Sequence, residues 1–387
     1  MTLASFFVDL HVHIGRDMFN KPVKITGSKT LTLTNILKES SRNKGIDMVG
    51  VIDSHSPAVI LEMEELLANG SATESNDGGI YYENVTLILG SEIEVYDQLC
   101  NGPIHVLCFM PYLSTMKTFS KWLATKMTNI NLSSQRYYGS GKELQLKVKE
   151  LGGLFIPAHV FTPFKSLYGK GVKQSFTEVF DAELIDGIEL GLSADSKMAD
   201  QITELHNYTF VTNSDAHSLS KIAREYQEIK FLEPSFKELN WALRGLNERE
   251  IITNFGMNPL LGKYHKSVCG KCLNFTDGKA KCDFCGSTKI IKGVVNRIEE
   301  IKNSTIDSLT RPPYIYQVPL EYIPSLGPKT FEKLLDHFDT EMNIIHQVPK
   351  DELQNVVGTR IADAIMKMRA GTLKFKSGGG GKYGKLL

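Results

Sequence analysis

The sequence predicts an α/β fold in which a parallel sheet closes into a barrel, and three observations favour it. Short apolar runs typical of strands alternate with helical segments through residues 1–260, a pattern found in parallel sheets. Most of these runs lead directly into His, Asp or Glu, and (β/α) barrels carry their active sites at the strands' carboxyl ends. Ligands from so many strands fit a closed barrel better than an open doubly wound sheet, which is the alternative fold.

The elements follow one another in a regular order. The first predicted strand, 8–13, ends in His11 and His13, whose side chains share a face because strand residues alternate. A helix is predicted over 32–44 and ends at Gly45. The later predicted strands, with the polar residues at or near their ends, are 48–53 (Asp53, His55), 85–90 (Glu92), 102–107 (His105), 153–159 (His159), 185–190, and 210–217 (Asp215, His217). Further helices are predicted at 58–68 and within 114–150.

Ten polar residues, most of them at these strand ends, are candidate ligands for a cluster of metal ions. Six of the ten histidines in the chain lie there, although each one alone is compatible with an ordinary buried histidine. Imidazole and carboxylate groups bind zinc, manganese and other divalent ions, and such ions activate water for attack on a phosphodiester. The candidates are His11, His13, Asp17, Asp53, His55, Glu92, His105, His159, Asp215 and His217.

Charge is distributed unevenly along a chain of zero formal net charge. Residues 1–110 hold 7 Lys/Arg against 14 Asp/Glu, whereas residues 262–297 hold 8 against 2. This indicates a metal-binding front and a polyanion-binding rear. No apolar run of about 18 residues and no signal-peptide pattern is present, so we expect no membrane association and a cytoplasmic protein.

Four cysteines form two Cys-x-x-Cys pairs, Cys269/Cys272 and Cys282/Cys285, separated by nine residues. This spacing is typical of a closed, tetrahedral structural zinc site, whereas a redox Cys-x-x-Cys normally occurs once. So small a module cannot build its own core, and metal binding should supply its folding energy. Because lysines surround the pairs, we expect contact with nucleic acid.

Two Gly-containing hairpins follow, about thirty residues apart. Both resemble the helix-hairpin-helix motif, whose backbone amides at a helix start bind the DNA backbone without reading sequence. A protein-binding helical bundle is the alternative. The expected DNA contacts are Gly327, Lys329, Thr330, Gly358, Thr359 and Arg360.

The strand-end motifs Asp9-Leu-His-Val-His13, Asp53-Ser-His55, Pro157-Ala-His159 and Ser214-Asp-Ala-His217, together with Glu92 and His105, resemble the PHP (polymerase and histidinol phosphatase) family. The resemblance implies a distorted (β/α)7 barrel that holds up to three divalent ions, which would be zinc, manganese or magnesium. It implies Asp215, Glu92 and His159 as catalytic residues. The implied ligand sets are His11, His13, Glu92 and Asp215 for one ion, Glu92, His105 and His159 for a second, and His55 and His217 with Asp17 or Asp53 for a third.

The order of the regions resembles the endonuclease Q family: barrel 1–260, four-cysteine zinc module 261–300, all-α helix-hairpin-helix domain 301–375 and flexible tail 376–387. That family cuts DNA 5′ of deaminated bases (uracil, hypoxanthine, xanthine) and of abasic sites. The resemblance implies damaged DNA, double- or single-stranded, as the partner. We expect a monomer, and recruitment by a sliding clamp or another repair protein stays open. The alternatives are a PHP phosphatase acting on a small phosphorylated substrate or nucleotide, and a DNA-binding adaptor without chemistry.

The loop after His159 is rich in aromatic residues. An enzyme that inspects a base must take it out of the stack and hold it in a pocket. We therefore expect Phe161, Phe164 and Tyr168 to line a base pocket. The alternative is that these rings only cover the barrel end.

Overall fold

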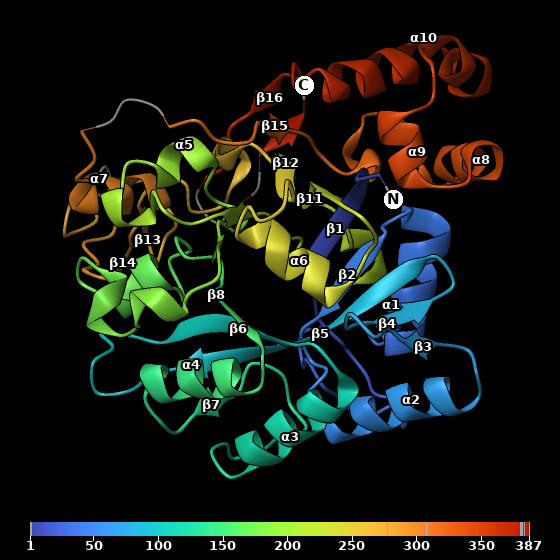
Figure 1. Ribbon diagram of the computed structural model, residues 1–387. Coiled ribbons are helices and arrows are strands. Elements are labelled where there is room, and N and C mark those ends of the chain that lie inside the picture. The colour runs from blue at the N-terminus through green and yellow to red at the C-terminus, as the bar shows by residue number, and fades with distance from the viewer. Residues whose placement is uncertain (1, 277, 306–308, 380–381, 383, 387) are drawn as a thin grey trace.

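Seven strands form a closed ring in the computed structural model (Figure 1), which describes residues 2–276, 278–305, 309–379, 382 and 384–386. Backbone hydrogen bonds join β8 to β9, and a parallel bridge between Val12 and Ala216 closes the ring. The α/β barrel expected from the sequence is therefore confirmed. In ring order the strands are β1 (Ala4–Val12), β2 (Met48–Val51), β5 (Val85–Val95), β6 (Ile104–Met110), β8 (Leu154–Pro157), β9 (Ile188–Glu189) and β10 (Phe210–Val211).

The ring departs from an all-parallel sheet at β6, which runs antiparallel to both β5 and β8. Only eight residues, 96–103, connect β5 to β6. A parallel neighbour needs a crossover of a dozen residues or more, so a connection of this length forces the chain to turn back. This antiparallel strand is what makes the barrel distorted.

Apolar residues fill the ring on both faces, because successive side chains of a strand point to opposite sides. In β5, Ile88 joins an inner cluster with Leu10 and Leu107, whereas Leu87 and Leu89 face outward toward the helices. The six helices associated with the barrel are α1 (Leu33–Lys38), α2 (Pro57–Ala68), α3 (Leu113–Ala124), α4 (Gly141–Glu150), α5 (Ser196–Ala199) and α6 (Phe236–Leu243). A π-helix continues α1 to Lys44, and Gly45 ends it with a φ of 72°.

Further strands extend the sheet beyond the ring. β11 (Tyr226–Phe231) pairs with the first half of β1, and β12 (Glu250–Gly256) pairs with β11. The segment expected to begin an all-α domain instead contributes β15 (Tyr314–Tyr316), which pairs with β12. The small strands β3 (Thr73–Glu74), β4 (Ile80–Tyr82) and β7 (Arg136–Tyr137) attach along the β5 side.

In the described part of the four-cysteine module, the strands are β13 (Val268–Cys269) and β14 (Ile290–Ile291), joined by irregular loops and followed by α7 (Val294–Ile301). The helical region then comprises α8 (Pro328–Phe338), α9 (Glu341–His346) and α10 (Lys350–Arg369). It packs on the barrel, where the Tyr226 hydroxyl and Nε2 of His346 are hydrogen-bonded at 2.6 Å and the buried Lys44 pairs with Glu341 at 2.5 Å.

The tail, expected to be flexible, forms a short antiparallel pair between β16 (Phe375–Lys376) and β17 (Lys385–Leu386). Gly378 and Gly384 donate backbone hydrogen bonds to the carbonyls of Leu260 and Leu261. Residues 380–381, 383 and 387 of this tail lie outside the described residues. No described helix is long and apolar enough to cross a membrane.

A buried carboxyl makes the stability of the barrel depend on pH. Burial raises the pKa of Glu225 to about 8, and one of its carboxyl oxygens has no hydrogen-bond partner among the described residues. The folded protein therefore binds a proton that the unfolded chain releases above its ordinary pKa near 4.5, so stability falls as pH rises from about 4.5 to 8.

Glu225→Gln should remove most of that loss, since glutamine stays neutral. We expect the variant to gain on the order of a few kcal/mol relative to the parent between pH 6 and pH 8.5, measured by denaturant unfolding at both values. The matched change Glu228→Gln, three residues further along the chain and half-buried, should leave the pH dependence unaltered. Equal pH dependence in all three proteins would contradict the assignment to Glu225.

Candidate metal centre

Three groups of potential metal ligands meet at one end of the ring. In each group the ligand atoms all lie within 4.8 Å of one another. The groups share members, because Glu92 belongs to two of them and His13 to two. They are His11, His13 and Glu92; His13, Asp215 and His217; and Glu92, His105 and His159.

Glu92 of β5 lies at the middle of the cluster. One carboxylate oxygen is 2.8 Å from Nδ1 of His105 and 3.2 Å from Nε2 of His159, and the other is 3.6 Å from Nε2 of His13. Asp215 is placed similarly, with Oδ1 at 3.5 Å and 3.4 Å from Nε2 of His11 and His13. A carboxylate set between imidazoles in this way can bridge two cations.

The histidines of β1 are oriented by carboxylates behind them. His11 Nδ1 lies 3.0 Å from Oε1 of Glu189, and His13 Nδ1 lies 3.1 Å from Oδ2 of Asp53. The opposite Nε2 atoms of both rings are buried and have no hydrogen-bond partner among the described residues. This arrangement, with one nitrogen fixed by a carboxylate and the other left open, is typical of metal-ligating histidine, so the donor set fits a divalent ion.

The electrostatics of the centre favour a bound cation. Burial alone would lower the pKa of His11, but the carboxylates of Glu189 and Asp215 raise it to about 10. Burial would raise the pKa of Glu92, yet His105 and Lys24 hold it well below its usual value. Surroundings that stabilise a proton on a buried imidazole also stabilise a metal ion in its place.

Two of the candidate ligands sit on strained backbone. His159 has a φ of 31° and Asp215 a φ of 45°, in the left-handed region that non-glycine residues rarely adopt. Arg224 donates from Nε to the Ser214 carbonyl at 2.6 Å and so braces the second of these turns. Strain of this kind persists only where surrounding contacts over-determine it, and it concentrates at functional sites.

Three predicted ligands lie outside the three groups. Asp17 accepts backbone hydrogen bonds from Phe19 and Lys21 and so orders its own turn. Asp53 accepts from the backbone of Ile14 at 2.7 Å as well as facing His13, which places it behind a ligand. His55 is fully buried and joins none of the groups. The expected third set of ligands is therefore not assembled; His217 instead meets His13 and Asp215.

Sequence reasoning missed two residues of the centre. Glu189 contacts Nδ1 of His11 and so orients its ring. In the sequence, the feature that could have indicated Glu189 is an acidic residue inside the apolar run 185–190. Lys24 lies in a loop without any pattern, yet its Nζ is 3.3 Å from Glu92 and 2.7 Å from the Ser134 hydroxyl. Its ammonium adds a fixed positive charge beside the shared carboxylate.

The aromatic residues expected to line a base pocket divide into two kinds. Phe161 and Tyr168 are buried and stacked on each other at 5.4 Å, and the Tyr168 hydroxyl donates to Glu204. The Phe164 ring is 48% exposed and meets Tyr264 edge-on at 5.4 Å. Of the three, Phe164 is therefore the ring that a ligand can reach.

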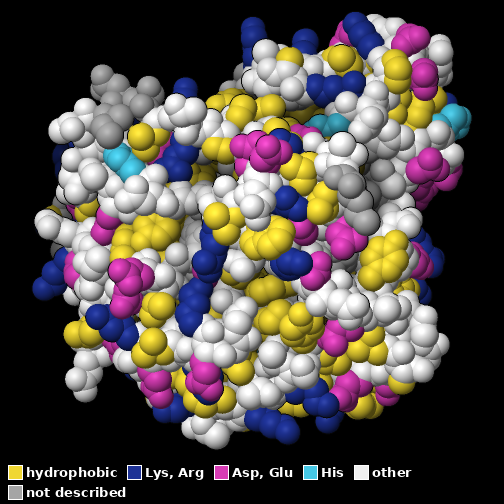
Figure 2. Space-filling model, viewed as in Figure 1, with side chains coloured by type: hydrophobic (Ala, Val, Ile, Leu, Met, Phe, Trp, Pro, Cys, Tyr) yellow, Lys and Arg dark blue, Asp and Glu magenta, His cyan; other side chains and the backbone are white. Residues whose placement is uncertain are grey.

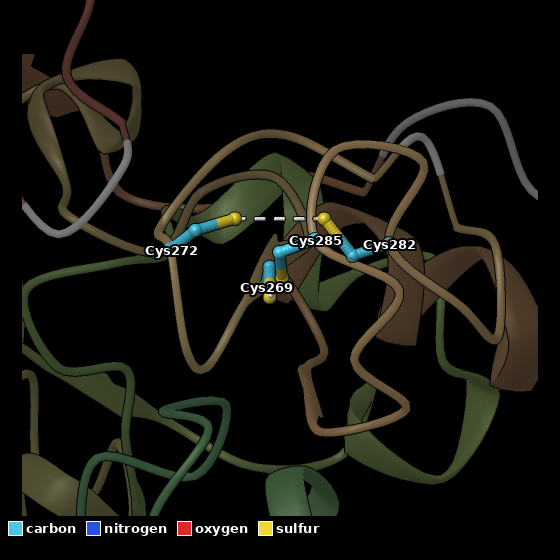
Figure 3. Close-up of side chains that lie close together, drawn as sticks. All are labelled: Cys269, Cys272, Cys282 and Cys285. Carbon is cyan, nitrogen blue, oxygen red and sulfur yellow. Dashed lines mark hydrogen bonds between the residues drawn. The ribbon is translucent and has the colours of Figure 1, made fainter.

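The four cysteines converge in the module (Figure 3), with all four sulfurs within 4.8 Å of one another. The Sγ atoms of Cys269 and Cys285, and those of Cys272 and Cys282, are 3.5 Å apart. A tetrahedron with Zn–S bonds of about 2.3 Å has edges of about 3.8 Å. Backbone N–H groups of Cys272 and Lys271 lower the pKa of Cys269 to about 6, and the N–H groups of Asn274 lower the pKa of Cys272, whereas the neighbouring thiols of Cys272 and Cys269 raise the pKa of Cys285. Two of the four cysteines therefore favour the thiolate that zinc requires.

Both predicted hairpin glycines lie on the surface of the helical region. Gly327 precedes α8, and Gly358 breaks α10 with a φ of 77°. A Cβ at either position would meet nothing within 4 Å. Lys329, Thr359 and Arg360 beside them are exposed. Thr330, the sixth expected contact, is partly exposed.

Comparison with known proteins gives a consistent result. No family model matches the chain. The chain is 51% identical over 385 residues, 99% of its length, to the whole of the uncharacterized protein YqxK of Bacillus subtilis. Among solved structures, the lesion-specific endonuclease PfuEndoQ from Pyrococcus furiosus aligns with a TM-score of 0.84 at 31% identity, over 99% of this chain and 95% of that one.

A second solved structure is endonuclease Q in complex with a 27-mer duplex substrate that has an abasic lesion at the active site. It aligns with a TM-score of 0.83 at 30% identity, over 99% of this chain and 96% of that one. Both alignments span barrel, cysteine module and helical region together. The chain therefore belongs to the endonuclease Q family.

Proposed function

We propose that the protein is a metal-dependent DNA repair endonuclease that cuts the phosphodiester bond 5′ of deaminated bases (uracil, hypoxanthine, xanthine) and of abasic sites. The observation that carries this proposal is the set of three ligand groups, two of which share Glu92, in a chain that aligns over its full length with PfuEndoQ, a lesion-specific endonuclease. The exposed hairpin glycines supply amides for a DNA backbone.

The residues of the centre divide the work of hydrolysis. His11, His13, Glu92, His105, His159, Asp215 and His217 would hold divalent ions, which would be zinc, manganese or magnesium. When bound, such ions lower the pKa of water toward neutrality and neutralise charge on phosphate oxygens. Glu189 and Asp53 hold the histidine rings in position. Asp215, Glu92 and His159 are the residues to which we assign catalysis.

Lys24 and the helical region complete the proposed reaction. The Lys24 ammonium, fixed beside Glu92, offers a permanent positive charge to a phosphodiester that enters the centre. Gly327, Lys329, Thr330, Gly358, Thr359 and Arg360 would hold the DNA backbone away from the cut. Zinc on the four cysteines would fold the module that lies between the barrel and the helical region in the sequence.

The test uses a labelled duplex with one deoxyuridine, incubated with protein and Mg²⁺ or Mn²⁺. We expect a single cut immediately 5′ of the uracil, leaving a 3′ hydroxyl and a 5′ phosphate, and no cut in an undamaged duplex. Asp215→Ala should abolish the cut. Rapid hydrolysis of a simple phosphomonoester, without any cut in uracil, hypoxanthine or abasic duplexes, would replace this proposal with the phosphatase alternative.

A further inference from the structure

A groove of about 600 Å³ separates the loop after β8 from the four-cysteine module. One wall is formed by Asn101 and residues within 163–173. The other is formed by Lys289, β14, Lys292 and Arg297 of α7. Figure 1 shows β14 and α7 beside the green segments that follow β8, and Figure 2 shows the same face with its side chains. The groove therefore lies between two regions that are more than a hundred residues apart in the sequence.

The groove is positively charged. It is lined by Lys170, Lys173, Lys289, Lys292 and Arg297, and none of the described residues that line it is acidic. Lys292 and Arg297 pair with Glu300, whereas Lys170, Lys173 and Lys289 are exposed. Three exposed lysines on facing walls offer positive charge to the phosphates of a nucleic acid chain.

Apolar surface completes the lining. The exposed ring of Phe164 stands at the groove, steadied by its edge contact with Tyr264, and Ile290 and Ile291 lie on the opposite wall. A basic groove that also offers an aromatic face is the arrangement that binds single-stranded nucleic acid, since bases stack on the ring while lysines follow the backbone. The volume is typical of pockets that hold small ligands, so it fits one strand rather than a double helix.

The walls are fastened to each other. Arg297 donates from Nε to the Tyr168 carbonyl at 2.8 Å and from Nη2 to the carbonyls of Val172 and Lys173 at 3.0 Å and 2.6 Å. The planar guanidinium thus bridges the segment after the zinc module and the barrel loop. The groove is a preformed feature of the fold.

The groove also borders the metal centre. The loop that forms its first wall begins immediately after His159, and its Lys165 carbonyl accepts a hydrogen bond from the backbone of His105 at 2.9 Å. Lys165 Nζ pairs with Glu94 at 2.8 Å on the strand that carries Glu92. The loop that walls the groove is therefore attached to the two strands that carry Glu92 and His105.

We propose that this groove binds unpaired nucleotides of the DNA strand that carries the lesion, with their phosphates on Lys170, Lys173 and Lys289 and a base against Phe164. The inference rests on the proposed endonuclease function and names the part of the substrate that this surface holds. The zinc module is then one wall of the strand-binding site rather than a separate anchor.

The test compares two triple variants in an Asp215→Ala background, which prevents cleavage. One is Lys170→Ala with Lys173→Ala and Lys289→Ala. The matched control removes three exposed lysines from outer helices, Lys38→Ala with Lys121→Ala and Lys142→Ala. Each triple variant therefore loses three positive charges. Binding of a single-stranded oligonucleotide and of an abasic duplex is measured by fluorescence anisotropy over a salt series.

We expect the groove variant to lower the slope of log affinity against log salt by about 2, as three lost contacts to a single strand predict, and the control to retain the parent slope. Phe164→Ala should weaken single-strand binding by about fivefold or more at an unchanged slope. Equal losses in the two triple variants would overturn the proposal. Lesion cleavage by the unmodified protein is scored separately, so failure of the endonuclease function and failure of the groove give different results.

Discussion

Glu92→Gln is expected to release the divalent ions of the barrel and to lower lesion cleavage by about a hundred- to a thousandfold or more, the range for loss of one essential electrostatic group. The carboxylate faces His105 and His159 on one side and His13 and Lys24 on the other. Glutamine keeps the shape but removes the negative charge. The histidines on both sides then lose the carboxylate that they share, and the partly buried ammonium of Lys24 is left beside a neutral amide.

Two readouts test this expectation together, the metal content after dialysis and the rate of cutting at deoxyuridine. Glu94→Gln is the matched control, because Glu94 lies on the same strand, belongs to none of the three ligand groups and approaches His105 only to 3.9 Å. The control should retain its ions. Unchanged metal content in Glu92→Gln would show that this carboxylate does not bridge.

Sequence reasoning reaches the ligands that lie on regular elements. His11 and His13 could be placed on one face because strand side chains alternate, and Glu92 and Asp215 because carboxyl ends of neighbouring strands converge. Those rules do not depend on side-chain detail. These rules predict only the position of each residue along the backbone of a strand. In the structure, these four residues do lie together.

What the rules could not reach depends on turns and on partners distant in sequence. Asp17 follows the first strand closely, but two backbone N–H groups of its own turn occupy its carboxylate. The reversed strand β6 follows from the short connection 96–103, and that length is known only once the structure shows that β5 extends to Val95. Lys24 enters the centre only because its loop folds against Ser134, 110 residues away.

The domain limits show the same effect. A strand of three residues, β15, is too short to stand out in a sequence, and it forms only because the edge of β12 is available to it. No sequence pattern indicated a role for His346, yet it stacks on Phe7 at 4.5 Å and forms a hydrogen bond with the Tyr226 hydroxyl. Contacts of this kind join the helical region to the barrel. The four regions that the sequence predicts therefore pack against one another rather than standing apart.

Removing zinc from the four cysteines is expected to unfold the module while the barrel stays folded. Among its described residues the module has two strands of two residues each and few buried apolar side chains, so we expect the metal to supply most of its stability. Zinc contributes on the order of 10–16 kcal/mol to such sites. Cys282→Ser removes the ligand on the second pair that is buried. Because β14 and Lys289 form one wall of the proposed groove, strand binding should be lost as well.

Limited trypsin digestion followed by mass spectrometry measures the effect directly. In Cys282→Ser, or after chelation, cleavage should become rapid at Lys271, Lys279 and Lys281, whereas sites in the barrel helices stay protected. Cys100→Ser, a half-buried thiol outside the module, is the control and should digest like the parent. Equal protection of the module with and without zinc would mean that packing against the barrel loop, through Arg297 and its three carbonyl partners, suffices to hold it. If the module loses its protection from trypsin when zinc is removed, the zinc is needed to fold the wall of the groove. DNA binding would then depend on a metal ion that takes no part in the chemistry.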